Sequence, residues 1–570
     1  MATRKGLAKL YSKLLSQLKS HWREILGIAL LLFAFLFTHR FFFLPGDFHT
    51  HDNVHFIRLY DLDKVLREGQ FPPRWLPDLG KGFGYPFFNF YPPFAYYVGE
   101  VFHVLGFSFT AANKLSFALA GAVGTAGFFS LINYWFGFWP AFGATFMWLF
   151  LPYRAVDLYV RGVLAEYWGM NLLPLVFYFA QKLFDRPLLK NLIGFSLFLA
   201  ILLISHNGVA LIGGLWLIFF IIFNFISQKQ LRNVRKIVIF VLGGFLAFGL
   251  AAYFIMPALL EKDFTQVKEM FTDYYAYYVH FPSFRQLFLS RFWGYSGSNY
   301  GTEDGMSFQI GYLHWLFVLL GVLVFFREKI ARFFCLSFLG FIFLIHAKSD
   351  FIWQQLTFLQ FLQFPWRLLL FAGFASSVVS GLVFRLIKNR WSKFWFIFLG
   401  LITLLLVTLN YSYFKPQKVE SIDDEYYLLE ENFRAQQWQF ITDYLPAQAT
   451  ELLNEFYRDP LVLSGVGEAT VLYNRTTEAE FIVDACDEAE VVIKRLCFPG
   501  WHLEIKDQPD KYTVSRNGFF VVPVKKGRNQ IKIYLEDTPL RSLANIVSLV
   551  SLGILGFLVA MIAVSNNNKV

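Results

Sequence analysis

Acidic and imidazole side chains are concentrated in one short segment that follows the first long apolar run. Two carboxylates and three imidazoles fall within nine residues, whereas charged residues make up only 16% of the chain. Carboxylates and neutral imidazoles accept protons as general bases and also bind divalent metal ions. The segment therefore predicts a general base, a metal site or both, against the alternative of an ordinary solvated loop. For a metal such as Mg²⁺, Mn²⁺ or Zn²⁺ the predicted ligands are Asp47, His49, His51 and His55, and Asp52 is the remaining acid.

The same loop continues with a stretch rich in proline, glycine and aromatic residues, residues 69–93. Trp75 and Tyr91 lie within it. Aromatic rings beside carboxylates can stack on a sugar ring, but they can equally anchor a loop at the headgroup level of a membrane. We predict that Trp75 and Tyr91 bind a substrate, with membrane anchoring as the alternative.

Several cationic side chains lie next to apolar runs and are candidates for binding a phosphate. A guanidinium forms paired hydrogen bonds with phosphate oxygens, so Arg367 is the first predicted phosphate partner, ahead of Arg154 and Arg161. The alternative for Arg367 is an arginine that closes a helix end and extends to the interface. His206, which precedes an apolar run, either contacts a substrate or hydrogen-bonds a neighbour.

The composition predicts the kind of protein that must position these residues. Hydrophobic residues make up 56% of the 570 residues, and the mean hydropathy is +0.45. A soluble protein has too little interior to bury so many apolar side chains, so we predict an integral membrane protein. In a membrane protein the net charge of +10 marks the cytoplasmic ends of helices rather than a nucleic-acid surface. Three cysteines exclude a cysteine-based metal framework.

Basic residues set the predicted orientation of the helices. Residues 1–24 form a basic N-terminus, and the short loops near 182–190, 229–236, 327–332 and 385–393 are also basic, which places all of them in the cytoplasm. The result is about twelve transmembrane helices with both termini inside. The predicted spans lie near 25–43, 115–135, 138–151, 168–183, 191–205, 208–226, 237–256, 308–326, 330–345, 368–386, 394–409 and 543–564.

The long segments between these spans are predicted to face outward. They are 44–113, 152–167, 257–307, 346–367 and a soluble domain at 410–541, which is followed by the last helix and a short cytoplasmic tail in 542–570. The short apolar run Phe94–Leu105 is predicted to lie along the membrane, because a crossing there would invert every later loop. Short strand patterns separated by turn residues predict that the soluble domain is a β-sandwich. Cys486 and Cys497 flank one predicted hairpin and are candidates for a disulfide.

Motifs along most of the predicted membrane part resemble a family of bacterial and archaeal membrane proteins, the 6-pyruvoyl-tetrahydropterin-synthase-related family, whose label does not concern pterin chemistry. These motifs are His51-Asp52, Pro72-Pro73-Arg74-Trp75, Tyr91-Pro92-Pro93, Tyr153-Arg154, Asp157–Gly162 with Glu166, Ser205-His206-Asn207, Pro257–Glu261, Trp293-Gly294-Tyr295 and Gln363–Arg367. In the soluble domain, Phe498-Pro499-Gly500-Trp501 resembles related bacterial membrane glycosyltransferases.

That family is similar to the wider GT-C superfamily, whose enzymes take a sugar from a polyprenyl-phosphate carrier at the outer side of the membrane. The resemblance implies a GT-C-like, all-α polytopic domain in residues 25–409, with a long first outer loop and the β-sandwich-like domain before the last helix. It implies a catalytic acid in the first outer loop, matched by Asp52. It implies a second acid in the second outer loop, matched by Glu166 with Asp157 as a rival. The histidines around Asp52 depart from the family pattern.

The predicted function is the transfer of a sugar, with inversion, from a polyprenyl-phosphate-linked donor to a glycolipid, a cell-wall polymer or a protein at the outer face of the plasma membrane. A carboxylate would accept the proton of the acceptor, and a cation would stabilise the departing phosphate. The alternatives are a transporter or flippase for lipid or polysaccharide and a non-catalytic factor of envelope assembly. A proton-coupled carrier would place ionisable groups near the centre of the membrane, whereas here the acids gather at one predicted face.

Overall fold

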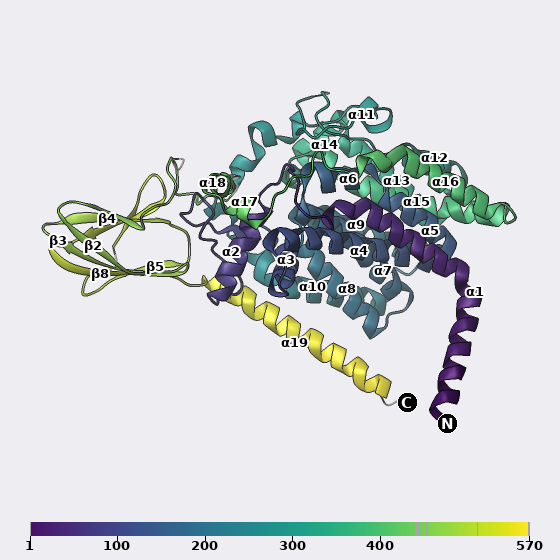
Figure 1. The fold of residues 1–570 in the computed structure, drawn as a ribbon, viewed down its shortest axis with the longest axis horizontal. Helices are drawn as coiled ribbons and strands as arrows, with labels where there is room; N and C mark the ends of the chain where they lie inside the picture. Colours follow the sequence, from purple (N-terminus) through teal and green to yellow (C-terminus); the bar gives the residue numbers. More distant parts are fainter. Residues whose placement is uncertain (1, 302, 440–443, 452–453, 510, 568–570) are drawn as a thin grey trace.

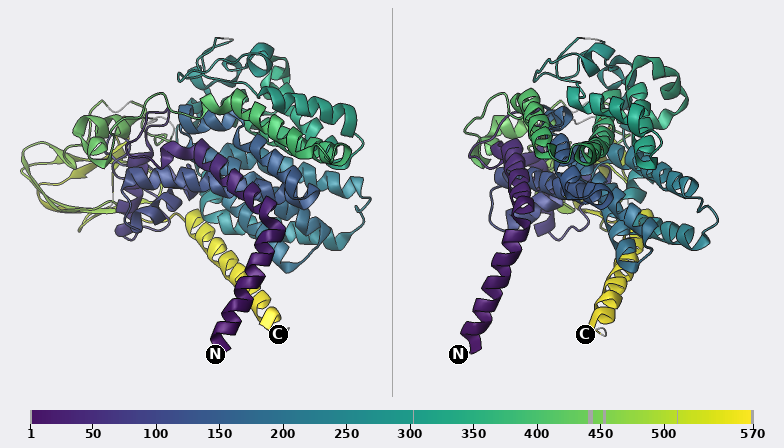
Figure 2. Two further views of the ribbon diagram at one scale, coloured as in Figure 1. Left: turned by 45° about the vertical axis from the view of Figure 1, so that its right-hand side comes forward. Right: turned by 90° about the vertical axis from the view of Figure 1, so that its right-hand side faces the viewer.

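The computed structural model consists of a helical body and a β-sandwich at one end of the long axis (Figure 1). It describes residues 2–301, 303–439, 444–451, 454–509 and 511–567. The last helix, α19 (Pro539–Asn567), runs from the sandwich along the outside of the body toward the N-terminus. Figure 2 shows from two further directions that both ends of the chain project on the same side of the body.

A helix occupies each segment that the sequence predicts as a span. The breaks between the helices coincide with glycine, proline and charged residues, which interrupt the apolar runs. The helices are α1 (Ala2–His39), α4 (Phe109–Phe136), α5 (Phe138–Leu149), α7 (Leu164–Asp185), α8 (Leu189–Leu203), α9 (Asn207–Ser227), α10 (Val234–Leu260), α12 (Tyr312–Phe325), α13 (Lys329–Ile345), α15 (Leu369–Arg390), α16 (Trp395–Asn410) and α19.

Length and hydropathy support fewer crossings than the predicted number. Among the described residues, seven helices are long and apolar enough to span a membrane, or eight if α13 and the segment after it, bent by 90°, form one span. Helices α8 and α12 are apolar but shorter, and α5 has only 12 residues. The polytopic, mostly helical fold is therefore confirmed, whereas about twelve crossings remain a prediction.

The apolar run after the first predicted span forms α3 (Phe94–Val104), which lies between α2 (His55–Arg67) and α4. Its 11 residues extend over about 16 Å, roughly half the thickness of a hydrocarbon core. Val101, Val104 and Leu105 are 59%, 73% and 69% exposed. A helix too short to cross, with an exposed apolar edge, fits a position along the membrane interface.

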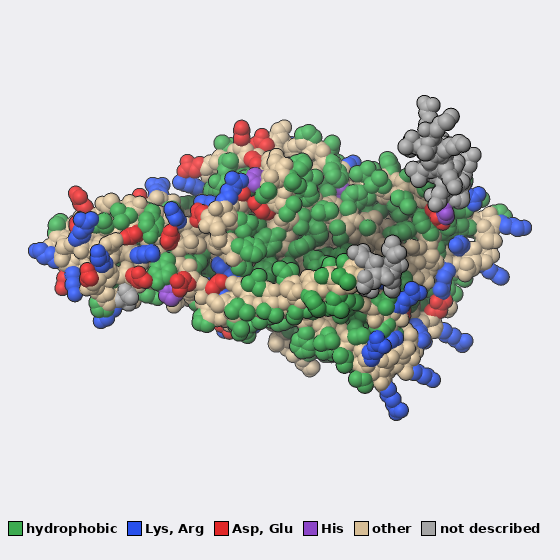
Figure 3. Space-filling model, turned by 90° about the horizontal axis from the view of Figure 1, so that it is seen from below, with side chains coloured by type: hydrophobic (Ala, Val, Ile, Leu, Met, Phe, Trp, Pro, Cys, Tyr) green, Lys and Arg blue, Asp and Glu red, His purple; other side chains and the backbone are tan. Residues whose placement is uncertain are grey.

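The surface separates charged side chains from a hydrophobic middle. Figure 3 shows hydrophobic side chains over the centre of the face seen from below, Lys and Arg at the end opposite the sandwich, and both charge signs on the sandwich. A hydrophobic zone between polar ends is the arrangement that a bilayer requires, and the basic end has the composition expected of a cytoplasmic side.

Residues 461–535 form the predicted β-sandwich from two antiparallel, four-stranded sheets. The strand orders are β1-β4-β7-β6 and β2-β3-β8-β5. Alternate residues of β3, such as Phe481 and Val483, are buried between the sheets, as the alternating sequence predicts. The strands are β1 (Leu461–Ser464), β2 (Gly467–Asn474), β3 (Glu478–Ala485), β4 (Ala489–Leu496), β5 (Trp501–Ile505), β6 (Thr513–Val514), β7 (Phe519–Val524) and β8 (Gly527–Leu535).

The expectation that Cys486 and Cys497 flank one hairpin is wrong. Strand β3, which ends just before Cys486, and strand β4, which ends just before Cys497, belong to different sheets. Both cysteines are free, Cys486 exposed and Cys497 buried. The short turn between β3 and β4 crosses from one sheet to the other, which the spacing of the strands alone does not reveal.

Two buried arginines join the sandwich and α19 to the helical body. Arg541 and Glu261 form an ion pair of 2.7 Å with both side chains almost inaccessible. Arg74, which precedes α3 in the chain, donates to Asp537 at 3.2 Å and to Asn545 at 2.9 Å. Removal of one partner of a buried ion pair typically costs about 3–5 kcal/mol, so these contacts hold the sandwich in place.

The orientation of the chain can be tested with two engineered cysteines. In a Cys486→Ser background, which removes the exposed cysteine, Lys526→Cys should react with a membrane-impermeant maleimide in intact cells. Arg232→Cys, in the basic loop between α9 and α10, should react only after permeabilisation. Labelling of Arg232→Cys alone in intact cells would contradict the predicted orientation.

Candidate functional site

Backbone hydrogen bonds join the first two predicted outer segments. We call the four segments loop 1 (44–113), loop 2 (152–167), loop 3 (257–307) and loop 4 (346–367). The amides of His51 and Asp52 in loop 1 donate to the carbonyls of Val160 and Arg161 in loop 2, at 3.1 and 3.0 Å. Gly162 has a φ of +65°, and a Cβ there would collide with the side chain of Thr50. Glycine therefore permits the close approach of loop 2 to the acidic segment of loop 1.

The Asp52 carboxylate is half-buried at this contact. Within the described part of the chain, its oxygens accept no hydrogen bond and form no ion pair. The charge of Asp52 raises the pKa values of the neighbouring His51, His55 and Arg58, and burial opposes this effect in each of them. A carboxylate with free lone pairs beside cationic and polar groups is able to accept a proton from a bound molecule.

His55 is fixed by a chain of hydrogen bonds next to Asp52. Its Nε2 donates to the Gly162 carbonyl at 2.5 Å, and its Nδ1 accepts from the Tyr96 hydroxyl at 3.0 Å. Arg58 in turn donates to the same hydroxyl at 3.1 Å. Burial lowers the pKa of His55 to about 4, so the ring is neutral at physiological pH and both nitrogens are engaged.

The predicted metal site is not formed, because its four residues have separate partners. Asp47 accepts from Tyr427 at 3.3 Å, and His49 accepts from Asn53 at 3.0 Å. His51 donates to the Tyr295 carbonyl at 3.2 Å, and His55 is engaged as described. Among the residues that the structure describes, no group of three or more His, Cys, Asp or Glu side chains could hold a metal ion. The quartet Asp47, His49, His51 and His55 therefore does not fit a metal site.

Glu166 is the centre of a buried ion-pair network. Arg161 donates to both of its oxygens, at 2.9 and 2.8 Å, and the Tyr153 hydroxyl donates to Oε1 at 2.7 Å. Arg367 Nε and His206 Nε2 lie 3.5 and 4.0 Å from Oε2. Glu166 is 1% exposed. Its carboxylate thus acts as a shared counter-ion that positions two arginines, and it is not free to act as a base.

Asp157 shares the same guanidinium but differs from Glu166 in its partners. Its Oδ1 accepts from Arg161 at 2.8 Å, while its buried Oδ2 has no hydrogen-bond partner among the described residues. Burial first, and then the Glu166 carboxylate, raise the pKa of Asp157 above its usual value. Of the two buried carboxylates that share Arg161, Asp157 is therefore the more easily protonated.

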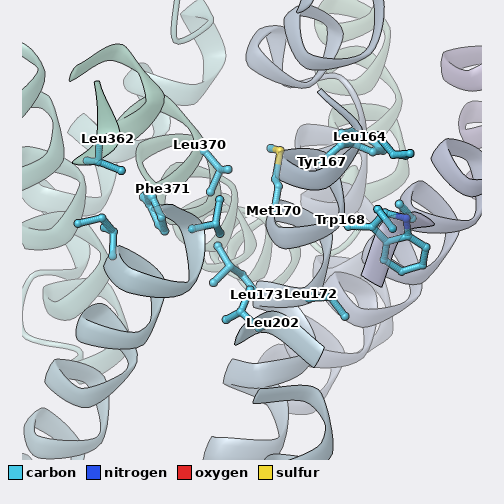
Figure 4. Close-up of a cluster of buried hydrophobic side chains, with 14 of the residues drawn as sticks. Leu164, Tyr167, Trp168, Met170, Leu172, Leu173, Leu202, Leu362, Leu370 and Phe371 are labelled. Atoms are coloured by element: carbon cyan, nitrogen blue, oxygen red, sulfur yellow. The ribbon is translucent and has the colours of Figure 1, made fainter. Parts of the chain in front are cut away.

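The packing of α7 fixes the position of Glu166 in the first turn of that helix. Glu166 also benefits there from the positive end of the helix dipole. Figure 4 shows the apolar residues of α7 against side chains of α8, α15 and loop 4. The labelled residues are Leu164, Tyr167, Trp168, Met170, Leu172, Leu173, Leu202, Leu362, Leu370 and Phe371. Full burial of one such side chain stabilises the fold by about 1.5–3 kcal/mol.

Arg367 extends from a turn at the end of loop 4 toward Glu166. Its Nη1 donates to the Leu362 carbonyl at 2.9 Å and to the Gln363 side chain at 3.2 Å. Its side chain is 19% exposed, and its Nη2 has no partner among the described residues. One edge of this guanidinium therefore remains available to an anion.

Loops 3 and 4 complete the site. The Trp366 ring lies 4.7 Å from the Arg161 guanidinium carbon, and its Nε1 donates to Ser298 of loop 3 at 3.1 Å. Loop 3 also provides the Tyr295 carbonyl that accepts from His51. All four predicted outer segments thus meet around Asp52, Arg161 and Glu166.

His206 takes one of the two roles that the sequence leaves open, the hydrogen bond to a neighbour, while a contact with a substrate stays a prediction. It caps α9, where its Nδ1 accepts from the Val209 amide at 3.1 Å. Its Nε2 faces Glu166, and burial lowers the pKa of His206 to about 4. The ring is therefore a neutral neighbour of the Glu166 network at physiological pH.

Three other predicted binding residues have internal partners. Arg154 is completely buried and donates to Asn171 and Tyr167 at 2.6 and 2.7 Å, and both terminal nitrogens of Arg161 donate to the partners named above. Trp75 is 1% exposed and packs edge-on against Trp501 of the sandwich at 5.3 Å between ring centroids. The prediction that Trp75 binds a sugar is therefore wrong, because no face of its ring is accessible.

Tyr91 remains near Asp52, although its ring is not free on both faces. It stacks on Phe87 with 4.7 Å between centroids, and the Arg58 guanidinium carbon lies 4.7 Å from its centroid. Tyr153, Tyr96 and Arg58 also belong to the site, and sequence reasoning did not identify them. Tyr153 is adjacent to Arg154 in a motif, and Arg58 follows the acidic segment by one helical turn, which are the only sequence signals for them.

The chain belongs to the family described as "6-pyruvoyl-tetrahydropterin synthase related domain; membrane protein", whose model matches residues 88–414, more than half of the chain. The match includes loop 2, Arg367 and most of the helical body. It excludes Asp52 and the sandwich, so the family match gives no information on the role of Asp52. A search of curated proteins finds no match.

Solved structures show distant similarity. ArnT from Cupriavidus metallidurans, bound to undecaprenyl phosphate, shares 13% identity over 65% of this chain, with a TM-score of 0.36. The Archaeoglobus fulgidus oligosaccharyltransferase in the apo form shares 12% identity over 78% of this chain, with a TM-score of 0.44. The archaeal oligosaccharyltransferase AglB from the same organism, in complex with an inhibitory peptide and a dolichol-phosphate, shares 13% identity with a TM-score of 0.40. In each case this chain spans 62% of the other chain.

The two buried acids are predicted to respond differently to loss of charge. Glu166→Gln leaves Arg161 and Arg367 without their shared counter-ion and should lower the free energy of unfolding by about 3–5 kcal/mol. Asp157→Asn resembles the neutral form of a carboxyl with a raised pKa and should cost about 1 kcal/mol. Thermal unfolding in detergent compares the two variants. Equal destabilisation would show that Asp157 carries a full charge in the folded protein.

Proposed function

We propose that the protein is a membrane glycosyltransferase that moves a sugar from a polyprenyl-phosphate-linked donor to an acceptor at the outer face of the plasma membrane. The observation that carries the proposal is the Asp52 carboxylate, which accepts no hydrogen bond from a described residue at the point where the four loops converge. The resemblance of loop 1 to that of GT-C enzymes supports a catalytic role for the same residue. The acceptor is a glycolipid, a cell-wall polymer or a protein.

In the proposed reaction an acceptor oxygen or nitrogen attacks the anomeric carbon of the donor sugar. The bond between this carbon and the phosphate oxygen breaks, and the polyprenyl phosphate leaves with the electron pair. Asp52 accepts the proton of the acceptor. A single displacement of this kind inverts the configuration at the anomeric carbon.

Arg367 would bind the departing phosphate. Its Nη2, which has no partner among the described residues, can donate to a phosphate oxygen, and a guanidinium stabilises the charge that develops as the bond breaks. Glu166 acts as a positioning residue, because its carboxylate holds Arg161 by two hydrogen bonds and lies 3.5 Å from Arg367 Nε. Arg367 would then contact the phosphate of the donor, and Asp52 would contact the acceptor.

Replacement of the proposed base gives the most direct mutational test of the reaction. Asp52→Asn should lower turnover by about a hundred- to ten-thousand-fold, since the amide cannot accept the proton. Binding of undecaprenyl phosphate and the unfolding temperature should remain close to wild type, because Asp52 makes no internal hydrogen bond in the described chain. Transfer of radiolabelled sugar from a polyprenyl-phosphate donor measures the rate, with Asp487→Asn on the exposed sandwich surface as control.

Wild-type turnover in Asp52→Asn would remove Asp52 from the catalytic role. A variant that also keeps full cellular function would favour a transporter or a non-catalytic assembly factor instead.

Replacement of Arg367 tests the phosphate contact separately. Arg367→Lys keeps the charge but loses the planar set of donors, so the affinity for undecaprenyl phosphate should fall roughly ten- to a hundred-fold. Stability should change less, because the main chain of loop 4 keeps its own hydrogen bonds. Arg390→Lys, in the basic end of α15, is the matched control. Wild-type affinity in both Arg367→Lys and Arg367→Ala would show that Arg367 only anchors loop 4.

A further inference from the structure

An open cavity lies beside α18 (Glu430–Trp438), the helix that precedes the sandwich. Its volume is about 530 Å³, within the range of roughly 300–1,000 Å³ that is usual for small-molecule sites. It is lined by Glu430, Glu431, Arg434, Ala435, Trp438 and Phe456. None of these residues takes part in the Asp52 and Glu166 site.

The lining combines aromatic faces with charged groups of both signs. Trp438 is 54% exposed, so a large part of its indole ring is accessible to a ligand. The Phe456 ring has two cationic neighbours, since Lys81 Nζ and the Arg434 guanidinium carbon lie 5.3 and 5.2 Å from its centroid. Arg434 also pairs with Glu430 at 2.6 Å. Hydrogen-bond donors and acceptors therefore surround an exposed indole.

This combination fits a sugar better than other ligand classes. The C–H groups of a sugar ring pack on the electron-rich face of an aromatic ring, while its hydroxyls donate to carboxylates and accept from a guanidinium or an ammonium. An anionic ligand would meet the repulsion of Glu430 and Glu431. An extended peptide would find few main-chain partners, because most of the lining comes from a helix whose backbone groups are already bonded.

Helix α18 is also attached directly to loop 1. The Gln436 side chain accepts from the Ile57 amide at 3.2 Å, and the Gln439 side chain donates to the His51 carbonyl at 3.3 Å. The Lys81 amide donates to the Gln437 carbonyl at 3.0 Å. One of these bonds reaches the residue that precedes Asp52, so the cavity and the acidic segment share a rigid support.

We propose that this cavity binds a neutral oligosaccharide through Trp438, Glu431 and Arg434. The bound glycan would be the acceptor of the transfer, and this second statement rests on the proposed function, whereas binding itself does not. An acceptor held on α18 would be delivered to the loop that carries Asp52.

The test measures binding of three trisaccharides, mannotriose, cellotriose and chitotriose, to the full-length protein in nanodiscs by saturation-transfer NMR and calorimetry. At least one should bind to the wild type, and Trp438→Ala should weaken its binding by about tenfold or more, the loss expected when an aromatic stacking partner is removed. Glu431→Gln should weaken it less. Trp391→Ala, which removes another exposed indole (47%) at the end of α15, should leave binding unchanged.

Three results would overturn the proposal. These are no binding of any trisaccharide to the wild type, equal binding to the wild type and Trp438→Ala, or saturation of the cavity by a pooled tetrapeptide library in place of the sugars. The last result would assign the cavity to a peptide. Asp52→Asn separates the two proposals: glycan binding that persists while transfer is lost supports both, whereas transfer that persists contradicts only the catalytic role.

Discussion

The buried ion pair between Glu166 and Arg161 is the interaction on which the arrangement of the loops depends. Both oxygens of Glu166 accept from Arg161, and the pair is almost inaccessible to solvent. A lone charge at that depth would be strongly unfavourable, so each partner requires the other. Arg161 also contacts Trp366 of loop 4, and its carbonyl accepts from the Asp52 amide of loop 1. The ion pair therefore holds loops 1, 2 and 4 together.

The geometry separates two functions that carboxylates can serve. Glu166 is saturated with donors and stabilises neighbouring cations, whereas Asp52 has no hydrogen-bond partner in the described chain and retains its lone pairs. A similar contrast applies to the arginines, since both terminal nitrogens of Arg154 and of Arg161 donate to buried partners, whereas Arg367 Nη2 has no partner among the described residues. Groups with spare hydrogen-bonding capacity beside saturated ones mark the place where a substrate can complete the network.

Much of this organisation could be predicted from the sequence, because hydrophobic runs and turn residues report directly on helices and strands. The helix at each predicted span, the short α3 and the two-sheet sandwich follow from such patterns. The four residues predicted as metal ligands do not come together, because spacing along a loop does not determine where side chains point. His55 forms hydrogen bonds with Gly162 and Tyr96, and Asp47 accepts one from Tyr427. The predictions for Trp75 and for the hairpin between Cys486 and Cys497 failed for a related reason. The contact of Trp75 with the sandwich and the assignment of β3 and β4 to different sheets depend on residues far apart in the sequence.

The central claim is that the convergence of the four loops creates the site where a lipid-linked phosphate meets Asp52. The most direct measurement is a cryo-EM structure of the full-length protein in nanodiscs with undecaprenyl phosphate. The account predicts phosphate density within hydrogen-bonding distance of Arg367 Nη2, on the side of the Glu166 network that faces Asp52. A phosphate bound elsewhere, with Arg367 and Asp52 both free of the lipid, would contradict it.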